Sequence, residues 1–182
     1  MPTLITVGNQ KGGVGKTTTA VTLAHGLAIK GYQVLLIDCD PQGQCATFLG
    51  LQQEPGMYDF LVKEQGLAEV ARPADSESRQ RQGLSIVPGD KRTGAAAVLL
   101  ASEHFNVKVL SERLAGVTNY HYIVFDTAPS VASFQEAAIH ASDWLIIPVA
   151  TDYPSTEGMI GILDTMNVVN KRHEGRCQLL GI

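Results

Sequence analysis

The sequence predicts the α/β class, with a doubly wound, mainly parallel sheet and helices on both of its faces. Short apolar runs typical of buried strands alternate with segments in which apolar residues have helical spacing. The first apolar run, residues 4–7, is followed by a glycine-rich turn and a helical segment. With 182 residues, 45% of them hydrophobic, the chain has the size and composition of one domain with a substantial core. We therefore expect residues 1–182 to form a single domain.

The glycine-rich turn, Gly8–Thr18, has the composition of a phosphate-binding loop. Glycines let the backbone curl round an anion so that successive N–H groups point inward, and the helix that follows adds unpaired N–H donors. We expect Lys16 to reach the β- and γ-phosphates of a nucleotide and the Thr17 hydroxyl to bind Mg²⁺. The predicted nucleotide-binding residues are Lys11, Gly12, Gly13, Val14, Gly15, Lys16, Thr17 and Thr18.

The loop departs from the usual pattern G-x-x-x-x-G-K-[ST] because Gln10 stands where the first glycine should be. It carries a second lysine, Lys11, and the run Lys-Gly-Gly-Val-Gly-Lys-Thr-Thr resembles the deviant Walker A loop of the ParA/MinD group of P-loop ATPases. That group is related to the nitrogenase iron protein. The resemblance implies the P-loop NTPase fold, the cofactors ATP and Mg²⁺, and a Lys11 that reaches the nucleotide of a partner subunit. A solvated loop lysine, or a glycine turn that binds nothing, is the alternative.

The first helix should run from Lys16 to Lys30, with Gly31 as its C-terminal cap, and Val34–Ile37 reads as a buried strand. Asp38 and Asp40 follow that strand, so they lie at the sheet edge where ligands bind in doubly wound folds. Because they are two residues apart, they share a face of an extended chain.

The segment from Asp38 to Gly43, Asp-Cys-Asp-Pro-Gln-Gly, resembles switch I of the ParA branch. The resemblance implies that Asp40 orients the attacking water, and that Asp38 holds a water in the Mg²⁺ shell. Lys11, Lys16 and Asp40 are thus the predicted catalytic residues. An Asp-Pro turn with solvated acids is the alternative. Cys39 and Cys45 are interpreted as small filling residues, because no histidine lies near them in the sequence.

The middle of the chain carries fewer signals. Residues 47–61 are compatible with helix but are interrupted at residues 54–56, and residues 72–82 read as an exposed loop. Leu84–Val87 should be the third strand, and helical stretches follow at 95–103 and 107–114.

Tyr122–Asp126 is predicted to be the fourth strand and has the form of a Walker B strand, an apolar run that ends in one aspartate. Asp126-Thr-Ala-Pro129 also resembles the D-x-x-P switch II of the same family. The resemblance implies that Asp126 holds Mg²⁺ through water, so Thr17, Asp38 and Asp126 form the predicted metal site. Taken alone, a strand-end aspartate is as often only a helix cap.

The last third should contain a short helix at 135–141, a strand at 144–149, and a helix capped by Ser155 or Thr156. Its expected buried face consists of Met159, Ile162, Leu163, Met166 and Val169. Asp152 either faces the partner subunit, paired with a lysine such as Lys11, or is a plain helix-start acid. A sixth strand begins at Cys177 and the chain stops inside it. We therefore expect a fold truncated after the sixth strand, without the adenine-contacting part of the family domain.

Composition excludes several classes of protein. A net charge of −4 does not suggest a chain coated with cations for nucleic acid, although a local patch is compatible with it. Three cysteines without C-x-x-C spacing indicate neither a disulfide framework nor a zinc site. The sequence shows no signal peptide and no membrane-spanning run, so we expect a cytoplasmic protein that does not bind membrane. Candidate DNA contacts are Arg79, Arg81, Lys91, Arg92, Lys171, Arg172 and Arg176.

Resemblance to small ParA/Soj-type proteins implies a role in plasmid or chromosome segregation. An ATP-bound homodimer would bind DNA non-specifically, associate with the nucleoid, and be regulated by a ParB-like partner. A ParA-like protein that positions another cargo, such as a protein microcompartment, is the first alternative. A MinD-like membrane cycler would need a C-terminal amphipathic helix. A nitrogenase-reductase-like electron carrier would need cysteines that share a cluster at a dimer axis.

Overall fold

A computed structural model describes residues 1–75, 79–102, 106–129 and 132–182. Its strands form one seven-stranded sheet in the order β3-β4-β2-β5-β1-β6-β7. Neighbouring strands are parallel except β3 and β4, which are antiparallel. The strands are β1 Thr3–Val7, β2 Val34–Asp38, β3 Arg72–Pro73, β4 Leu84–Val87, β5 Tyr122–Asp126, β6 Trp144–Ile146 and β7 Gln178–Gly181. The predicted doubly wound, mainly parallel α/β fold is confirmed.

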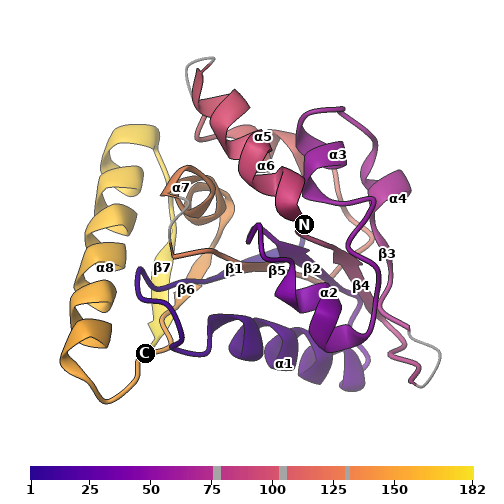
Figure 1. Cartoon of the computed structure of the whole chain (residues 1–182), viewed down its shortest axis with the longest axis horizontal. Coiled ribbons are helices and arrows are strands. Elements are labelled where there is room, and N and C mark those ends of the chain that lie inside the picture. Colours follow the sequence, from indigo (N-terminus) through magenta and orange to yellow (C-terminus); the bar gives the residue numbers. More distant parts are fainter. Residues whose placement is uncertain (76–78, 103–105, 130–131) are drawn as a thin grey trace.

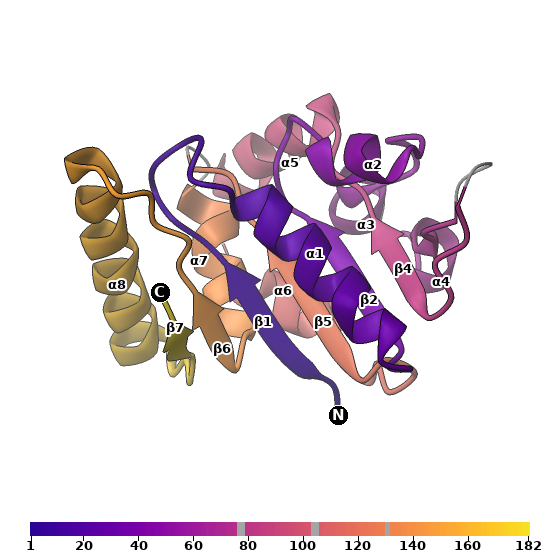
Figure 2. The same cartoon turned by 90° about the horizontal axis from the view of Figure 1, so that it is seen from below.

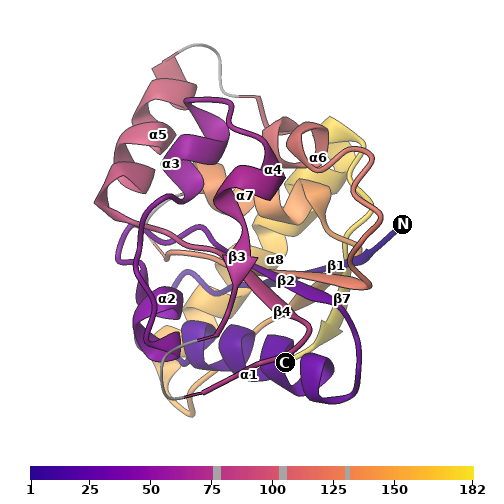
Figure 3. The ribbon, with the colours of Figure 1, turned by 90° about the vertical axis from the view of Figure 1, so that its right-hand side faces the viewer.

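Helices cover both faces of the sheet (Figure 1). Two lie on one face, α1 Lys16–Ile29 and α2 Gln44–Leu49, and Figure 2 shows α1 crossing the strands from that side. The opposite face carries α3 Met57–Leu61, α4 Leu67–Val70, α5 Lys91–Ser102, α6 Val109–Arg113 and α7 Ala132–Ala141. Figure 3 views this sandwich from its β3 side. The last helix, α8 Tyr153–His173, packs against α7 at the β6–β7 end.

The core follows from the strand period of two residues. In β2, Leu35 and Ile37 point to the face that holds Phe60 and Phe134, whereas Leu36 points to the face covered by the alanines of α1. All residues of β2 are buried, as expected for a central parallel strand with helices on both faces. The central strands are therefore fixed in position, and so are the polar residues at their carboxyl ends.

Several predicted boundaries differ from the structure by a few residues, and two of these differences have a clear local reason. Strand β6 ends at Ile146 instead of continuing to Val149; Pro148 lies beyond it, and proline has no backbone N–H to donate to a ladder. Helix α5 begins at Lys91 rather than near residue 95, because the Asp90 carboxylate accepts hydrogen bonds from the backbone amides of Arg92 and Thr93. The predicted end of that helix, residue 103, lies outside the described residues.

The interpretation of residues 72–82 as an exposed loop is wrong in part. Arg72–Pro73 pairs with β4 as β3, and residues 76–78 lie outside the described residues. Arg81 is only 9% exposed, and its guanidinium donates to the carbonyls of Ala74 (2.8 Å) and Leu49 (3.2 Å). Arg81 therefore holds two chain segments together, and the prediction that it contacts DNA is wrong.

Candidate functional site

The loop between β1 and α1 has the backbone conformation that its glycines predict. Gly13 and Gly15 have φ values of 76° and 88°, a left-handed region that strains residues with a side chain. Gly15 is the N-terminal cap residue of α1 and no side chain caps this helix, which leaves N–H groups of its first turn for a ligand. A Cβ atom at Gly12, Gly13 or Gly15 would meet no other atom within 4 Å, so the space beside the loop is open.

Lys16 turns back across this loop. Its side chain is largely buried, and Nζ donates a hydrogen bond to the backbone carbonyl of Lys11 at 2.7 Å. Burial lowers the pKa of Lys16, while the carboxylates of Asp126 and Asp40 act in the opposite direction. The lysine is therefore held between the loop and the acidic residues of two other segments.

The acidic residues meet because β2, β5 and β1 are neighbours in the sheet. Asp38 lies opposite Asp126 in the parallel register of β2 and β5, and Asp126 lies opposite Val7, the last residue of β1. The two carboxyl groups are buried. Burial and then the charge of Asp126 raise the pKa of Asp38 to about 8. Burial raises the pKa of Asp126 to about 6, although hydrogen bonds from the Thr17 and Cys45 side chains act to lower this pKa.

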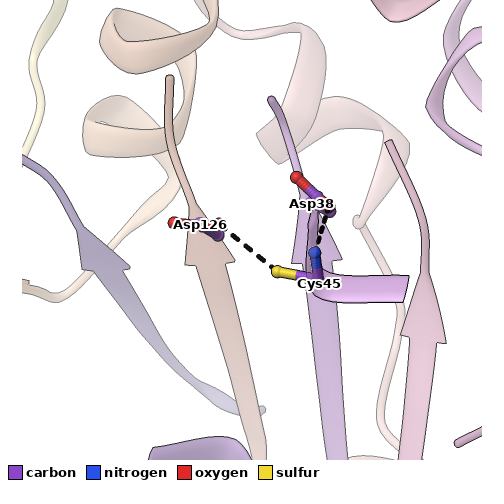
Figure 4. Close-up of side chains that lie close together, drawn as sticks. All are labelled: Asp38, Cys45 and Asp126. Atoms are coloured by element: carbon purple, nitrogen blue, oxygen red, sulfur yellow. Dashed lines mark hydrogen bonds between the residues drawn. The ribbon is translucent and has the colours of Figure 1, made fainter. Parts of the chain in front are cut away.

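Cys45, from α2, bridges the two strand-end acids (Figure 4). Its backbone N–H donates to Asp38 Oδ2 at 3.1 Å, and its thiol donates to Asp126 Oδ2 at 3.3 Å. Cys45 packs in the core, as predicted for a filling residue, but it also makes this contact, which no motif in the sequence predicts. Burial raises the pKa of the Cys45 thiol well above its usual value, so the sulfur keeps its proton and acts as a donor.

The second carboxylate oxygen of Asp126, Oδ1, is buried and has no hydrogen-bond partner among the described residues. A buried carboxylate oxygen without a donor is costly unless a ligand satisfies it. Oxygen is the ligand atom that Mg²⁺ prefers, directly or through water, and the Thr17 hydroxyl is close enough to Asp126 to lower the pKa of its carboxyl group by hydrogen bonding. This part of the site therefore fits a divalent cation.

A cleft of about 310 Å³ lies against the loop. Besides loop residues it is lined by Asp40, Gln44, Phe48 and Pro129, so the predicted switch residue Asp40 reaches the same space as Lys16. The sequence analysis does not identify Gln44 or Phe48 as site residues. Gln44 precedes the helical stretch expected from residue 47, whereas α2 begins directly after Gly43, and Phe48 lies within that stretch but belongs to no motif. A larger hollow of about 630 Å³, at the C-terminal end of α1, is lined by no residue of the glycine loop.

The predicted cap of α8 is wrong. Asp152 is the N-cap residue, and its Oδ1 accepts a hydrogen bond from the Ser155 amide at 2.8 Å, while Ser155 itself is buried inside the first turn. The helix-start interpretation of Asp152 is thus confirmed, and its pairing with a lysine across a subunit boundary stays a prediction. The predicted buried face of α8 is confirmed by Ile162, Met166 and Val169.

Together, the glycine loop between β1 and α1, the inward lysine and the strand-end aspartates define a P-loop nucleoside triphosphatase. Comparisons with known proteins place the chain more closely. A family model described as an AAA domain matches residues 2–179. The chain is 35% identical to the sporulation initiation inhibitor protein Soj of Bacillus subtilis, over 100% of this chain and 72% of that protein. It is 36% identical to the chromosome-partitioning ATPase Soj of Thermus thermophilus, over 98% and 67% of the two chains.

A solved ATP complex of a substituted form of McdA from Cyanothece has the same fold, with a TM-score of 0.87. Its sequence is 26% identical, and the match covers 99% of this chain and 68% of that one. The chain therefore belongs to the AAA-domain family, in the ParA/Soj-type branch of the ParA/MinD P-loop ATPases. Among the described residues, no helix is both long and apolar enough to span a bilayer.

Proposed function

We propose that this protein is an ATP-switched, Mg²⁺-dependent ATPase that works as a homodimer in the segregation of DNA. One observation carries the ATPase proposal: three segments far apart in the sequence meet beside an open glycine loop, where Lys16 and Asp40 line one cleft and the charge of Asp126 acts on Lys16. The cofactors are ATP and Mg²⁺, in keeping with the family and with the ATP complex of McdA.

The residues divide the work of phosphoryl transfer by position. The backbone of Gly12–Thr18 and the ammonium of Lys16 hold the phosphates. Thr17, Asp38 and Asp126 would hold Mg²⁺, directly or through water, and the bound ion offsets the charge of the phosphates beside these acids. Asp40, at the cleft and partly exposed, orients the attacking water.

The two lysines of the loop differ in their surroundings. Lys16 is largely buried and its ammonium is bonded inside the loop, whereas Lys11 is exposed. An exposed lysine beside a nucleotide site is available to a second molecule, which supports a Lys11 that acts on the nucleotide of a partner subunit. Hydrolysis would then depend on dimerisation, and ATP, which bridges two chains, would be the switch.

The DNA cargo, nucleoid association and a ParB-like regulator extend the proposal beyond the ATPase. They are supported by the similarity to proteins named for chromosome partitioning. The structure narrows the predicted DNA contacts, because Arg92 forms ion pairs with Glu54, Asp59 and Asp90, and Arg176 with Asp143. Exposed cations that remain from the predicted set are Arg79, Lys91, Lys171 and Arg172.

Sedimentation velocity with ADP, ATP and a slowly hydrolysed ATP analogue tests the switch. Lys16→Ala should abolish nucleotide binding, and Lys11→Ala should keep binding but lose the ATP-dependent dimer. Asp40→Ala should accumulate the ATP dimer, because binding persists while hydrolysis stops. Lys30→Ala, at the far end of α1, is the matched control and should behave as the parent. An unchanged ATP dimer in Lys11→Ala would remove its trans role, and unimpaired hydrolysis in Asp40→Ala would remove the role of that carboxylate.

A DNA-binding assay under the same nucleotide conditions tests the cargo. Retention of duplex DNA by the protein with the slowly hydrolysed analogue, and not with ADP, is the expected result. An ATP-dependent dimer that does not bind DNA would contradict the segregation role and favour another cargo.

A further inference from the structure

The part of the loop that carries Lys11 is docked on the beginning of α8. The Gln10 amide donates to the Gly158 carbonyl at 3.5 Å, and the Gln10 side chain donates to the Thr165 hydroxyl at 3.2 Å. The rest of the loop, Gly12–Thr18, continues instead into α1. The loop therefore has two anchors, one for the phosphate cradle and one for Lys11.

Asn9 is the centre of the second anchor. It is completely buried, and its Nδ2 donates to the carbonyls of Pro148 (2.9 Å) and Ser155 (3.4 Å). Its Oδ1 accepts a hydrogen bond from the Lys11 amide at 2.8 Å. One side chain thus joins the segment after β6, the first turn of α8 and the backbone of Lys11. Only an amide supplies both the donors and the acceptor at this length.

Gly158 allows this docking. A Cβ atom there would overlap Asn9 Oδ1 and would lie 2.9 Å from the Lys11 amide nitrogen and 3.0 Å from Lys11 Cβ. Glycine inside a helix is unfavourable relative to alanine, so its presence in α8 requires a reason. The reason is that the backbone of Lys11 approaches the helix too closely for any side chain.

We infer that Asn9 is a positioning residue for Lys11, and that Asn9 and Gly158 together make α8 the platform from which Lys11 reaches a second subunit. The inference rests on the role proposed for Lys11 and extends it to residues that touch neither the phosphates nor the metal site. Loosening this anchor should displace Lys11 and leave the Lys16 cradle intact.

Two variants disrupt the contacts between the Lys11 segment and α8 in different ways. Asn9→Asp keeps the acceptor for the Lys11 amide but replaces the donors to Pro148 and Ser155 by carboxylate oxygens. Gly158→Ala leaves Asn9 unchanged and pushes the loop off α8. In both, KM for ATP should stay within about twofold of the parent, while kcat falls by about tenfold and the ATP-dependent dimer is lost, as in Lys11→Ala. A general loss of structure would instead change KM and nucleotide binding.

Matched glycine variants control for the helix substitution itself. Gly26→Ala, in α1, adds a Cβ that meets no atom within 4 Å and should not change turnover. Gly161→Ala lies one turn further along α8, and the three atoms nearest its Cβ belong to the flexible side chain of Gln10. It should therefore disturb only the bond from Gln10 to Thr165 and have a smaller effect than Gly158→Ala.

Amide hydrogen exchange gives a readout that needs neither dimer nor turnover. Exchange of the Lys11 amide should rise in Asn9→Asp and Gly158→Ala, while the amides of residues 16–18 keep their protection. If Lys11→Ala itself leaves dimerisation and turnover unchanged, the trans role proposed for Lys11 fails, and exchange alone decides whether Asn9 positions Lys11. If Lys11→Ala is impaired but both anchor variants behave as the parent, the inference fails and the proposed function stands.

Discussion

Two residues, Asp38 and Asp126, dominate the electrostatics of the apo site. Their carboxyl groups end adjacent strands and are buried together, which raises both pKa values, to about 8 and about 6. A divalent cation would replace the bound protons with a stronger positive charge in the same place. Metal binding, protonation and stability are therefore coupled at this pair.

The first prediction follows from the sign of that coupling. Between the unfolded pKa of 3.8 and the folded values of about 6 and about 8, the folded apo protein binds more protons than the unfolded chain. Its free energy of unfolding should therefore fall as pH rises through this window. Thermal unfolding of the apo protein from about pH 5 to about pH 8 measures the slope, which should flatten in the double variant Asp38→Asn/Asp126→Asn. With Mg²⁺ and ATP the gain in Tm should be larger at the alkaline end. An apo Tm that rises across the window would contradict the protonated pair.

The second prediction concerns Cys45, whose thiol is a donor to Asp126. Cys45→Ala removes the donor, so Asp126 loses a hydrogen bond that stabilises its charged form, and the Mg²⁺ concentration for half-maximal ATPase activity should rise several-fold. Cys45→Ser keeps a donor and should stay close to the parent. Cys177→Ala, at a buried cysteine near β7, is the control for loss of a thiol. Equal Mg²⁺ dependence of the alanine and serine variants would show that Cys45 only fills space.

At the scale of elements, the strands were predicted well and the short helices less well. Val34–Ile37, Leu84–Val87 and Tyr122–Asp126 are mainly apolar runs, interrupted only by Ser85 and ended by Asp126, and the fold buries most of their residues. Strand β3 could not be read from Arg72–Pro73, because two residues carry no period and their pairing with β4 is long-range. The start of helix α2 is predicted too late in the sequence for a similar reason. Its six residues cover less than two turns, which is too short for a clear helical period.

The residues of the candidate site also fall into two groups, those that the sequence predicts and those that it does not. Residues inside contiguous motifs, from Gly12 to Thr18 and at Asp38, Asp40 and Asp126, could be predicted because chemistry requires those residue types at fixed spacing. Asn9 and Cys45 could not, because their partners are distant in the sequence: Asn9 bonds to Pro148 and Cys45 to Asp126. Their importance depends on strand order, which a motif does not contain.

The third prediction tests how β4 supports the segment after β2. Gly89 follows β4, and a Cβ there would overlap the Asp40 carbonyl and lie 2.9 Å from the Asp38 carbonyl. Gly89→Ala must displace that segment, so it should lower stability by about 1–3 kcal/mol and reduce ATP turnover. Gly94→Ala, in α5, is the control: its Cβ would lie 3.6 Å from Pro41, an ordinary contact, and helix propensity favours alanine by about 0.5–1 kcal/mol. Chemical denaturation and turnover measure both. A Gly89→Ala protein as stable as the parent would show that β4 does not hold the segment in place.

For the whole molecule, net charge says less about nucleic acid than the distribution of cations does. Several cations of this chain with net charge −4 are already engaged within the fold: Arg81 is buried, and Arg92 and Arg176 form ion pairs. Lys171 and Arg172 are exposed in the last turn of α8, beside His173. Lys30 is exposed at the C-terminal end of α1. Arg79 is exposed as well, and burial and then the charges of Arg81 and Arg79 lower the pKa of His25 in α1.

The last prediction compares these two places as contacts for the phosphate backbone. If α8 carries the contact, Lys171→Glu/Arg172→Glu should weaken duplex DNA binding by the ATP-bound protein and lower the slope of log affinity against log salt by about 2, because two phosphate contacts no longer release counterions. Lys30→Glu/Arg79→Glu changes the net charge by the same amount, so it separates a local contact from a general charge effect. An equal loss of DNA affinity in both variants would indicate non-local repulsion. A loss of affinity only in Lys30→Glu/Arg79→Glu would assign the contact to these two residues instead. Binding titrations at several salt concentrations, with the slowly hydrolysed analogue present throughout, distinguish the three results because only a direct contact changes the slope.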